Sequence, residues 1–447
     1  MISYLEYKSK LNKLIDNDLI VLGDINYFET FFTRSDSFSH FIRGVASLLI
    51  SSFKIIMKNI KKPIMVNSLI NKQYQYAFII DQDRADFMGL LIPLINRITS
   101  VNMAVLVLTT NKIYNQYLQK MRTQNLSFIF IDDGLVKGSS INYLVIIKNI
   151  IGSLIKTKKI RQISVSAYRN YCIQAIKYSY YNSVYSQIKN IEILNVVYIH
   201  LLFNPALKKN INGYKIALQH GTLGITDFNI FEGADEVILW GEKWRENLQN
   251  SYSGKMIPLG NPKFDNIYNH SNNYNGNLSK ILIISQTHGL SDIEKKIYFN
   301  YIKEFSIMQS GCSITIKLHP AESQSVYSDS GITCGNSLKI VKDGDLYKLI
   351  RDNDIVIGVN STVLLESVVI GKLVFCLPFS TIKIGWENNG IREIHTPSEL
   401  CEEIKKLKNP DYQLKMYAEQ QGIIIDYCSN IGIATNTIFK YLLSKIQ

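Results

Sequence analysis

The sequence predicts an α/β protein of two doubly wound parallel sheets facing across a cleft, and three observations support this fold class. Apolar runs of four to seven residues alternate with helix-length segments, the pattern of buried parallel strands joined by helical crossovers. This alternation occurs twice, on either side of a polar, turn-rich stretch at residues 271–279. Candidate functional residues follow several of these runs directly, at the strand ends where such folds bind their ligands.

Residues 1–72 precede the alternation and are expected to form an N-terminal extension. Within it, residues 36–60 place apolar side chains at three- and four-residue steps, with basic side chains such as Arg43 and Lys54 opposite, which predicts an amphipathic helix. Its uncharged stretch is far shorter than the ~20 residues that a membrane-spanning helix needs. We expect its apolar face to pack on the neighbouring domain, and leave open a peripheral contact with the inner face of the cytoplasmic membrane.

The first α/β series fills residues 73–270 and is expected to form the acceptor-side domain. Helices are predicted at residues 84–98 and 141–155, because apolar residues recur there at helical spacing. The predicted strands are residues 76–80, 103–109, 126–131, 161–167, 195–200, 214–219 and 236–240.

The second series fills residues 277–410 and is expected to form the donor domain. Residues 411–447 are expected to add C-terminal helices, and a return of this segment to the first domain is left open. Helices are predicted at residues 293–308 and 361–370, and strands at residues 280–286, 313–319, 338–341, 354–359 and 372–378.

Composition favours a cytoplasmic globular protein and excludes several functional classes. The six cysteines lie far apart, and the first residues lack the apolar core of a signal peptide. The net charge of +12 suggests an anionic partner, but without a zinc finger or a basic stripe interleaved with aromatics we expect no nucleic acid. No cluster has metal-ligand spacing, and neither GxxxxGK[ST] nor G-x-S-x-G is present, so we expect no metal, NTP hydrolysis or serine-hydrolase chemistry.

The most informative stretch is residues 354–367, where a buried strand ends and a helix opens. Asn360, Ser361 and Thr362 start that helix, and Glu366 follows one turn in. Simple capping would explain the hydroxyls. The same geometry also makes an anion site for a donor phosphate, and Glu366 could accept hydrogen bonds from a ribose.

A histidine ends another strand of the second series. His319 precedes Pro320, which stops the strand, so the imidazole is placed where it can donate a proton to a departing phosphate. The alternative is a histidine satisfied at a loop edge. In the first loop of this series, Thr287 is a weaker candidate for contact with donor phosphate.

The first series offers two candidate bases. Asp132 and Asp133 precede Gly134 at a strand end, where one carboxylate could accept the proton of an acceptor hydroxyl; Asp-Asp-Gly is also ordinary turn chemistry. A second strand end carries His220, Gly221 and Thr222, which suits base catalysis or anion binding. Further on, the turn that contains Gly260 and Asn261 exposes backbone amides and could touch the donor; its alternative is a structural turn.

In order along the chain, these motifs resemble the three signatures of bacterial sialyltransferases of the GT-B type: an acidic pair before glycine, His-Pro, and paired hydroxyls. The resemblance implies an inverting, metal-independent reaction with a CMP-sugar donor and no further cofactor. It also implies that Asp132 is the leading base, that His319 assists the departing CMP, and that Ser361 and Thr362 hold its phosphate.

Other strings look like different GT-B families. His220-Gly221-Thr222 followed by Gly260-Asn261-Pro262-Lys263-Phe264-Asp265 looks like the layout of CDP-glycerol-dependent teichoic-acid and capsule polymerases, in which the histidine is the presumed base. The second string also looks like Kdo transferases, which use CMP-Kdo.

We therefore expect a glycosyltransferase that moves a sugar, sialic acid first, from a nucleotide donor to an oligo- or polysaccharide acceptor of capsule or lipooligosaccharide. A CDP-polyol or Kdo transferase is the alternative within the class. UDP-sugar 2-epimerases share the two-domain fold and are the alternative from another class, and a non-catalytic nucleotide-binding module is a third.

Overall fold

The chain is described as a computed structural model, and by its internal contacts it divides into two compact units. Among the described residues, the first unit holds those up to His220, those between 228 and 237, and those from Leu442 onward; the second holds the remainder. The structure describes residues 72–121, 123–131, 181, 185–186, 188–199, 204–224, 231, 233–268, 278–287, 290, 292–309, 311–335, 337–359, 361–379, 384–387 and 390–446.

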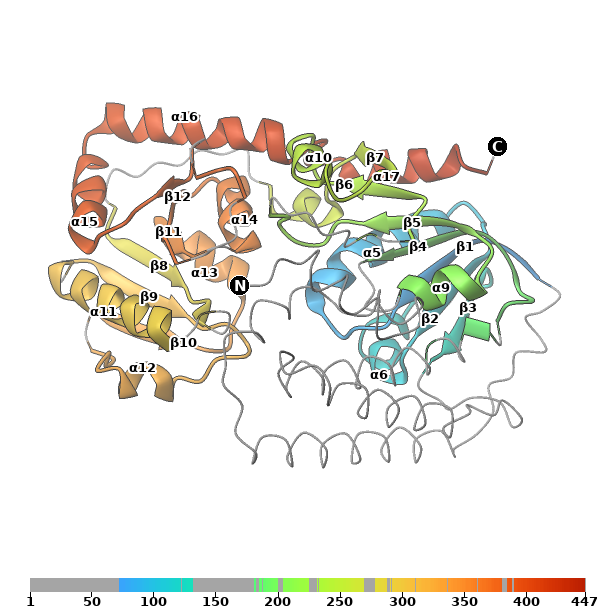
Figure 1. Cartoon of the computed structure of the whole chain (residues 1–447), viewed down its shortest axis with the longest axis horizontal. Coiled ribbons are helices and arrows are strands. Elements are labelled where there is room, and N and C mark those ends of the chain that lie inside the picture. The colour runs from blue at the N-terminus through green and yellow to red at the C-terminus, as the bar shows by residue number, and fades with distance from the viewer. Residues whose placement is uncertain are drawn as a thin grey trace, which may run out of the picture. The chain divides into compact units, whose positions relative to one another are not determined.

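A seven-stranded sheet, in the order β3-β2-β1-β4-β5-β6-β7, accounts for the earlier part of the described chain (Figure 1). The strands β3, β2, β1, β4 and β5 run parallel to one another. The helical and 3-10 segments along this part are α5 (Ala85–Thr99), α6 (Asn111–Ile113), η2 (Tyr114–Leu118), α9 (Asn204–Asn210), α10 (Lys243–Leu248) and η3 (Pro262–Asn266). The strands are β1 (Gln73–Ile80), β2 (Val105–Thr109), β3 (Leu126–Phe130), β4 (Glu192–Ile199), β5 (Tyr214–Leu218), β6 (Glu236–Leu239) and β7 (Lys255–Pro258).

Burial explains why these strands read as continuous apolar runs. All five residues of β2 are buried, as are the last five of β1, so both faces of the central strands are covered. A parallel sheet covered on both faces gives such runs rather than alternation. From β1 the chain adds strands first on one side, β2 and β3, and then on the other, from β4 onward, so the strand order reverses between β1 and β4. Ligands of such folds bind at this switch point.

The second sheet has six strands in the order β10-β9-β8-β11-β12-β13, all of them parallel to their neighbours (Figure 1). The predicted strands of this series are confirmed; β13, of two residues, was not predicted. The strands are β8 (Lys280–Ile284), β9 (Ser313–Lys317), β10 (Leu338–Val341), β11 (Ile355–Gly358), β12 (Leu373–Cys376) and β13 (Arg392–Glu393). The helices are α11 (Asp292–Met308), α12 (Ser325–Asp329), α13 (Leu346–Asp352), α14 (Thr362–Ile370), α15 (Pro397–Lys406), α16 (Pro410–Tyr427) and α17 (Ala434–Leu443).

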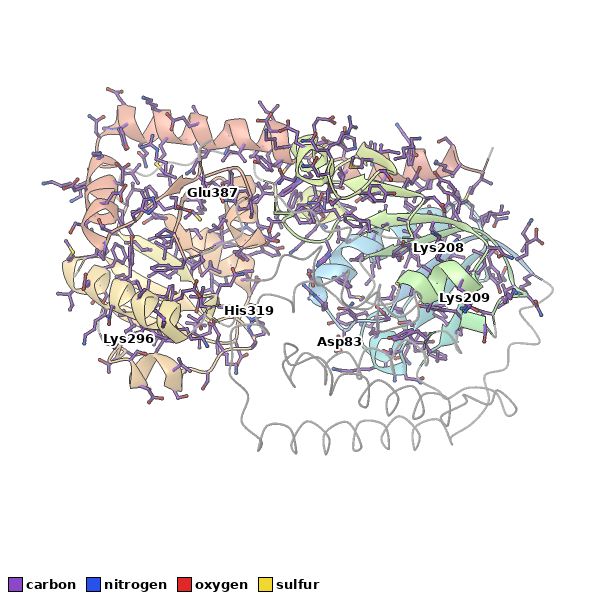
Figure 2. All side chains as sticks on the ribbon, in the orientation of Figure 1. Asp83, Lys208, Lys209, Lys296, His319 and Glu387 are labelled. Atoms are coloured by element: carbon purple, nitrogen blue, oxygen red, sulfur yellow. The ribbon has the colours of Figure 1, made fainter. Side chains whose placement is uncertain are left out.

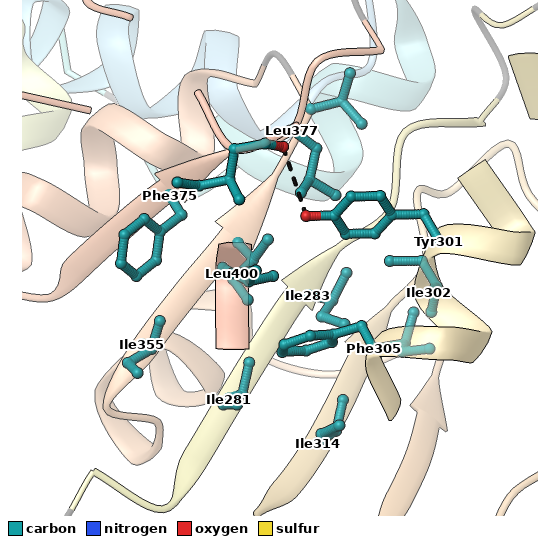
Figure 3. Close-up of a cluster of buried hydrophobic side chains, with 14 of the residues drawn as sticks. Ile281, Ile283, Tyr301, Ile302, Phe305, Ile314, Ile355, Phe375, Leu377 and Leu400 are labelled. Carbon is teal, nitrogen blue, oxygen red and sulfur yellow. Dashed lines mark hydrogen bonds between the residues drawn. The ribbon is translucent and has the colours of Figure 1, made fainter. Parts of the chain in front are cut away.

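Helices cover both faces of this second sheet. On one face, alternate strand residues such as Ile281, Ile283 and Phe375 pack with Phe305 of α11 and Leu400 of α15 in one buried cluster (Figure 3). The side chain of Tyr301 belongs to this cluster, and its hydroxyl donates to the carbonyl of Ile394 at 3.5 Å (Figure 3). On the other face lie α13 and α14, which contact β8, β11 and β12. The predicted doubly wound arrangement is therefore confirmed for this unit.

The helix α16 completes the second unit along β12 and α14 (Figure 1). Its Gln420 is fully buried and bonds β12 like another strand: its Oε1 accepts from the amide of Val374 at 3.1 Å, and its Nε2 donates to the carbonyl of Val374 at 2.6 Å. At the end of α16, the carbonyl of Tyr427 accepts from the indole of Trp244 at 2.9 Å. A buried amide with both partners satisfied fixes where α16 lies on the sheet.

Several predicted features lie outside the described residues. They are the amphipathic helix at 36–60, the segments 141–155 and 161–167, the linker at 271–277, and the site candidates Asp132, Asp133, Gly134 and Asn360. Of the helices that the structure describes, none has the length and apolarity that crossing a membrane requires.

Candidate functional site

Three neighbouring strands of the second sheet end beside predicted site residues. Thr287 follows β8, His319 follows β9, and Ser361 and Thr362 follow β11. Because β8 lies between β9 and β11 and all three run parallel, these residues share one edge of the sheet. The ends of β9 and β11 are two strand spacings apart, or about 10 Å. Figure 2 shows His319 at the edge where β9 ends.

The start of α14 is a capped helix end that a second segment approaches. Ser361 is the N-cap, and its Oγ accepts from the amide of Val363 at 3.3 Å. The hydroxyl oxygen of Thr362 accepts from the amide of Thr222 at 3.3 Å. A Cβ placed on Gly221 would lie 3.7 Å from the same hydroxyl oxygen. The structure thus brings Gly221 and Thr222 to the helix end predicted to bind an anion.

One turn further along α14, Glu366 pairs with the turn that follows β7. Its Oε1 lies 2.7 Å from Nζ of Lys263, and the two side chains are 2% and 20% exposed, so this is a buried ion pair. Lys263 also lies 5.5 Å from the centre of the Tyr347 ring. Burial alone would lower the pKa of Lys263, but Glu366 and Tyr347 beside it raise the pKa above its usual range. Lys263 therefore carries a full charge next to the helix end.

Besides the hydroxyl of Tyr347, two buried polar atoms beside this pair have no hydrogen-bond partner in the described part of the chain. They are Oε2 of Glu366 and Nδ2 of Asn261, and both residues are 1% exposed. The other end of the Asn261 amide is used, since its Oδ1 accepts from the amide of Lys263 at 3.0 Å. Buried polar atoms normally have partners, so this acceptor and this donor are candidates to bond a water or a ligand.

The residues of the turn from Gly260 to Asp265 have structural tasks as well. Gly260 has φ of +100°, and a Cβ there would lie 2.3 Å from the carbonyl oxygen of Ser429. Phe264 is fully buried against Trp240. The carboxylate of Asp265 accepts from the amides of Ala434 and Thr435 at 2.9 and 2.8 Å, and so caps α17. Both interpretations of this turn, structural and ligand-facing, therefore have support within one unit.

His319 is half-buried, and its neighbours define its tautomer. Its Nδ1 accepts from the amide of Ala321 at 3.1 Å, so in the neutral ring the proton is on Nε2, which is a donor. Pro320, next to it, is exposed. Glu322, which sequence reasoning missed, accepts from the amide of His319 at 3.2 Å and from the hydroxyl of Thr287 at 2.8 Å. Only its position three residues after His319 could have pointed to it.

In the first unit, His220 lies two residues beyond β5. Its ring contacts that of Phe87 on α5 edge-on, with 5.0 Å between ring centres and 69° between planes. The other candidate bases of this series, Asp132 and Asp133, are outside the described residues. Their assignment stays a prediction.

The first unit also contains an acidic residue that the sequence analysis did not single out. Asp81 directly follows β1, at the switch point of the sheet, and is half-buried. Burial raises the pKa of Asp81 to about 6, although its own backbone and the hydroxyl of Tyr181 act in the opposite direction through hydrogen bonds. A carboxyl that titrates near neutral pH at a ligand-binding edge is a candidate functional group.

We expect Asp81→Asn to stabilise the protein at pH 8. A carboxyl whose pKa is higher in the folded than in the unfolded chain holds more protons when folded, so the free energy of unfolding falls as pH rises from about 4 to about 6. Removing this ionisation should gain about 2 kcal/mol at pH 8 after allowance for partial exposure, and almost nothing at pH 4. Urea unfolding followed by far-UV circular dichroism at both pH values measures this.

The control is Asp83→Asn, two residues away, because Asp83 pairs with Lys112 at the surface. Exposed pairs contribute roughly 0–1 kcal/mol, so this variant should follow the wild type at both pH values. Equal behaviour of the two variants would contradict the burial of an ionisable Asp81.

Within the described residues, no group of three His, Cys, Asp or Glu side chains could hold a metal ion. No protein-family model matches the sequence, and no curated protein matches it.

Solved structures, in contrast, do match the whole architecture. A putative UDP-N-acetylglucosamine 2-epimerase from Listeria monocytogenes has a TM-score of 0.52 and 12% identity, over 84% of this chain and 97% of that one. The wall teichoic acid polymerase TagF, as a variant soaked with CDPG, has a TM-score of 0.50 and 13% identity, over 92% and 98%. The fold is GT-B.

A third GT-B structure is, like the first, a 2-epimerase by its name. The UDP-GlcNAc 2-epimerase from Neisseria meningitidis, bound to UDP-GlcNAc, has a TM-score of 0.50 and 14% identity, over 83% of this chain and 99% of that one. At such identities the likeness concerns the GT-B fold alone, and function has to be argued from the residues of the site.

Proposed function

We propose that this protein is a metal-independent, inverting glycosyltransferase that transfers a sugar from a cytidine-nucleotide donor, CMP-sialic acid first, to an oligo- or polysaccharide acceptor of the cell surface. The observation that carries the proposal is the convergence at the start of α14. Residues from three separate segments of the sequence meet there: Gly221 and Thr222, Asn261 and Lys263, and Thr362 and Glu366.

The start of α14 suits the phosphate of a nucleotide. The positive end of a helix attracts anions, and the Thr362 hydroxyl can add a hydrogen bond to one. The Lys263 charge is largely offset by Glu366, with which it is paired. In displacement of the sugar, negative charge develops on the phosphate oxygen that departs. A positive site that is already in place stabilises this charge without having to reorganise.

The unpartnered atoms beside the helix suit a ribose. A ribose hydroxyl can donate to Oε2 of Glu366, and another can accept from Nδ2 of Asn261. Each such bond would give a partner to a buried atom that has none among the described residues. A ligand that makes both bonds would offset the desolvation free energy of these atoms in the free protein.

His319 completes the proposed leaving-group side. Because Nδ1 accepts from the Ala321 amide, the neutral ring carries its proton on Nε2, the atom proposed to donate to the departing phosphate. On the acceptor side, the base is proposed to be Asp132 or His220; the acceptor hydroxyl loses its proton to it and attacks the anomeric carbon in line with the departing nucleotide.

A CDP-polyol or Kdo transferase is the second candidate. The specific observation in its favour is that Thr222 and Lys263, which belong to the strings shared with those families, bond to side chains of α14. A UDP-sugar 2-epimerase remains the candidate of another class, because 2-epimerases are among the GT-B structures that this chain resembles.

The test compares nucleotides first and donors second. We expect CMP or CDP to raise the melting temperature more than UDP, because at equal concentration a ligand that binds the folded state more tightly stabilises it more. Incubation with CMP-sialic acid, CMP-Kdo, CDP-glycerol and UDP-GlcNAc should then release a cytidine nucleotide from one donor. Preference for UDP, with UDP-GlcNAc converted in the absence of an acceptor, would replace the proposal with the epimerase.

Thr362→Ala locates the nucleotide within the unit. Loss of one hydrogen bond to a charged phosphate contributes about 1.5 kcal/mol, so the affinity for CMP should fall about tenfold. Ser328→Ala is the control, because its exposed hydroxyl donates within α12, to the carbonyl of Ser325. Equal CMP affinities of the two variants would place the nucleotide elsewhere.

A further inference from the structure

One buried carboxylate bonds two strand-end loops of the proposed donor site. Oε1 of Glu322 accepts from both the amide and the hydroxyl of Thr287, the latter at 2.8 Å. Oε2 accepts from the amide of His319 at 3.2 Å. Thr287 follows β8 and His319 follows β9, so a single side chain connects the ends of two neighbouring strands.

Hydroxyl groups beneath Glu322 extend this arrangement into the core. The hydroxyl of Tyr327 donates to Oγ of Ser285 at 2.5 Å and lies 3.3 Å from the hydroxyl of Tyr298. Glu322 is 7% exposed. Burial raises the pKa of Glu322, but hydrogen bonds from Ser285, Thr287 and His319 outweigh it and hold the pKa below its usual value. The carboxylate is therefore ionised at neutral pH.

The same carboxylate closes the turn that orients the His319 ring. The amide of Glu322 donates to the carbonyl of His319 at 2.9 Å, while its carboxylate accepts from the amide of His319. Inside this closed turn, the Ala321 amide donates to Nδ1 and leaves the proton on Nε2. The carboxylate therefore adds a side-chain bond to the turn in which the Ala321 amide sets the tautomer.

We propose that Glu322 is a positioning residue, which holds His319 and the Thr287 loop in the geometry that leaving-group departure requires. This inference rests on the proposed function. Glu322 itself does not touch the donor; it acts through the orientation of the imidazole. An ionised carboxylate is costly to bury, so a role in holding the site explains its place better than a contribution to folding.

The main test is Glu322→Gln, measured by kcat and by donor KM. The amide keeps one acceptor oxygen but presents an N–H group to one of the loop donors, so one of the two loops is released. We expect kcat to fall 10- to 100-fold and the donor KM to change less than threefold, because the groups that bind ribose at α14 are untouched. Glu322→Asp, which keeps the charge on a shorter side chain, should restore part of kcat.

Double variants separate positioning from general damage. If Glu322 acts through His319, then His319→Ala and His319→Ala/Glu322→Gln should have the same kcat within threefold, since the second change has nothing left to misplace. Fully multiplicative losses would overturn the inference. If Glu322→Gln does not fold, Thr287→Val takes its place, because it removes only the hydroxyl bond to Glu322. We expect Thr287→Val to lower kcat several-fold. In the His319→Ala background the same change should leave kcat unaltered.

Glu399→Gln is the matched control. Glu399 also accepts from a histidine amide, that of His395 at 2.9 Å, but it does so at the start of α15. Its kcat and KM should equal those of the wild type; a loss as large as that of Glu322→Gln would overturn the inference. If the wild type binds no nucleotide and releases none from any donor, the proposed function itself fails, whatever the variants do.

Discussion

Lys263→Met is expected to lower the free energy of unfolding by about 3–5 kcal/mol, because it leaves Glu366 buried without its cation. The Lys263 side chain is 20% exposed and that of Glu366 only 2%, so water cannot replace the lost partner. All three tryptophans, Trp240, Trp244 and Trp386, lie buried in the second unit, so urea unfolding followed by intrinsic fluorescence reports on the unit that holds the pair.

The double variant Lys263→Met/Glu366→Leu serves as its control. Replacing both charges with apolar groups is often neutral for a buried pair, so we expect this variant to recover at least about 2 kcal/mol over Lys263→Met. It should nevertheless bind CMP poorly, since both charged groups of the proposed site are gone. A single variant as stable as the wild type would mean that the Lys263 charge does not hold Glu366.

Gly260→Ala is expected to cost about 3 kcal/mol or more, from backbone strain and overpacking together. Only glycine adopts φ near +100° without strain, and the added Cβ would lie 2.3 Å from the carbonyl oxygen of Ser429 and 2.8 Å from Cβ of Ala434. Neither neighbour can yield easily, because one is backbone and the other begins α17. The same fluorescence-monitored unfolding measures this loss.

Gly422→Ala provides the opposite expectation in the same unit. Gly422 lies within α16, and an added Cβ would meet no atom within 4 Å. Alanine in a helix interior is favoured over glycine by about 0.5–1 kcal/mol, so this variant should be slightly more stable than the wild type. If both glycine variants shifted the midpoint alike, the close approach at Gly260 would be wrong.

The fold could be predicted because burial on two faces leaves a clear trace in the sequence. The run at 76–80 reads as a strand because a parallel strand between helical layers carries apolar residues at nearly every position. The run at 313–319 reads as a strand for a different reason, since its apolar residues alternate with polar ones. The strand β13 was missed because Arg392 and Glu393 are polar and half-buried at the edge of the sheet. Two residues without an apolar pattern carry no signal of this kind.

The sequence was enough to predict which loops form the candidate site, but not which of their side chains contact one another. Thr287, His319 and Thr362 each follow a predicted strand, and the carboxyl ends of parallel strands lie at one edge of a sheet. Their common place at that edge was therefore predictable. Which side chain bonds which is decided by pairs far apart in the chain, such as Lys263 with Glu366, 103 residues later. Local spacing does not encode such pairs. Asp81 was missed for a related reason: its raised pKa depends on burial that only the assembled sheet provides.

The first unit depends on residues that are synthesised long after its central strand. The hydroxyl of Tyr76 on β1 donates to the carbonyl of Leu442, 366 positions later, and buried Glu236 on β6 pairs with Lys445 at 2.7 Å, 209 positions later. During vectorial synthesis neither contact can form before residues 442–445 have been made, and such distant pairings carry a loop-closure entropy. The strands of this sheet are therefore synthesised well before the segment from Leu442 onward, which supplies two of their stabilising contacts.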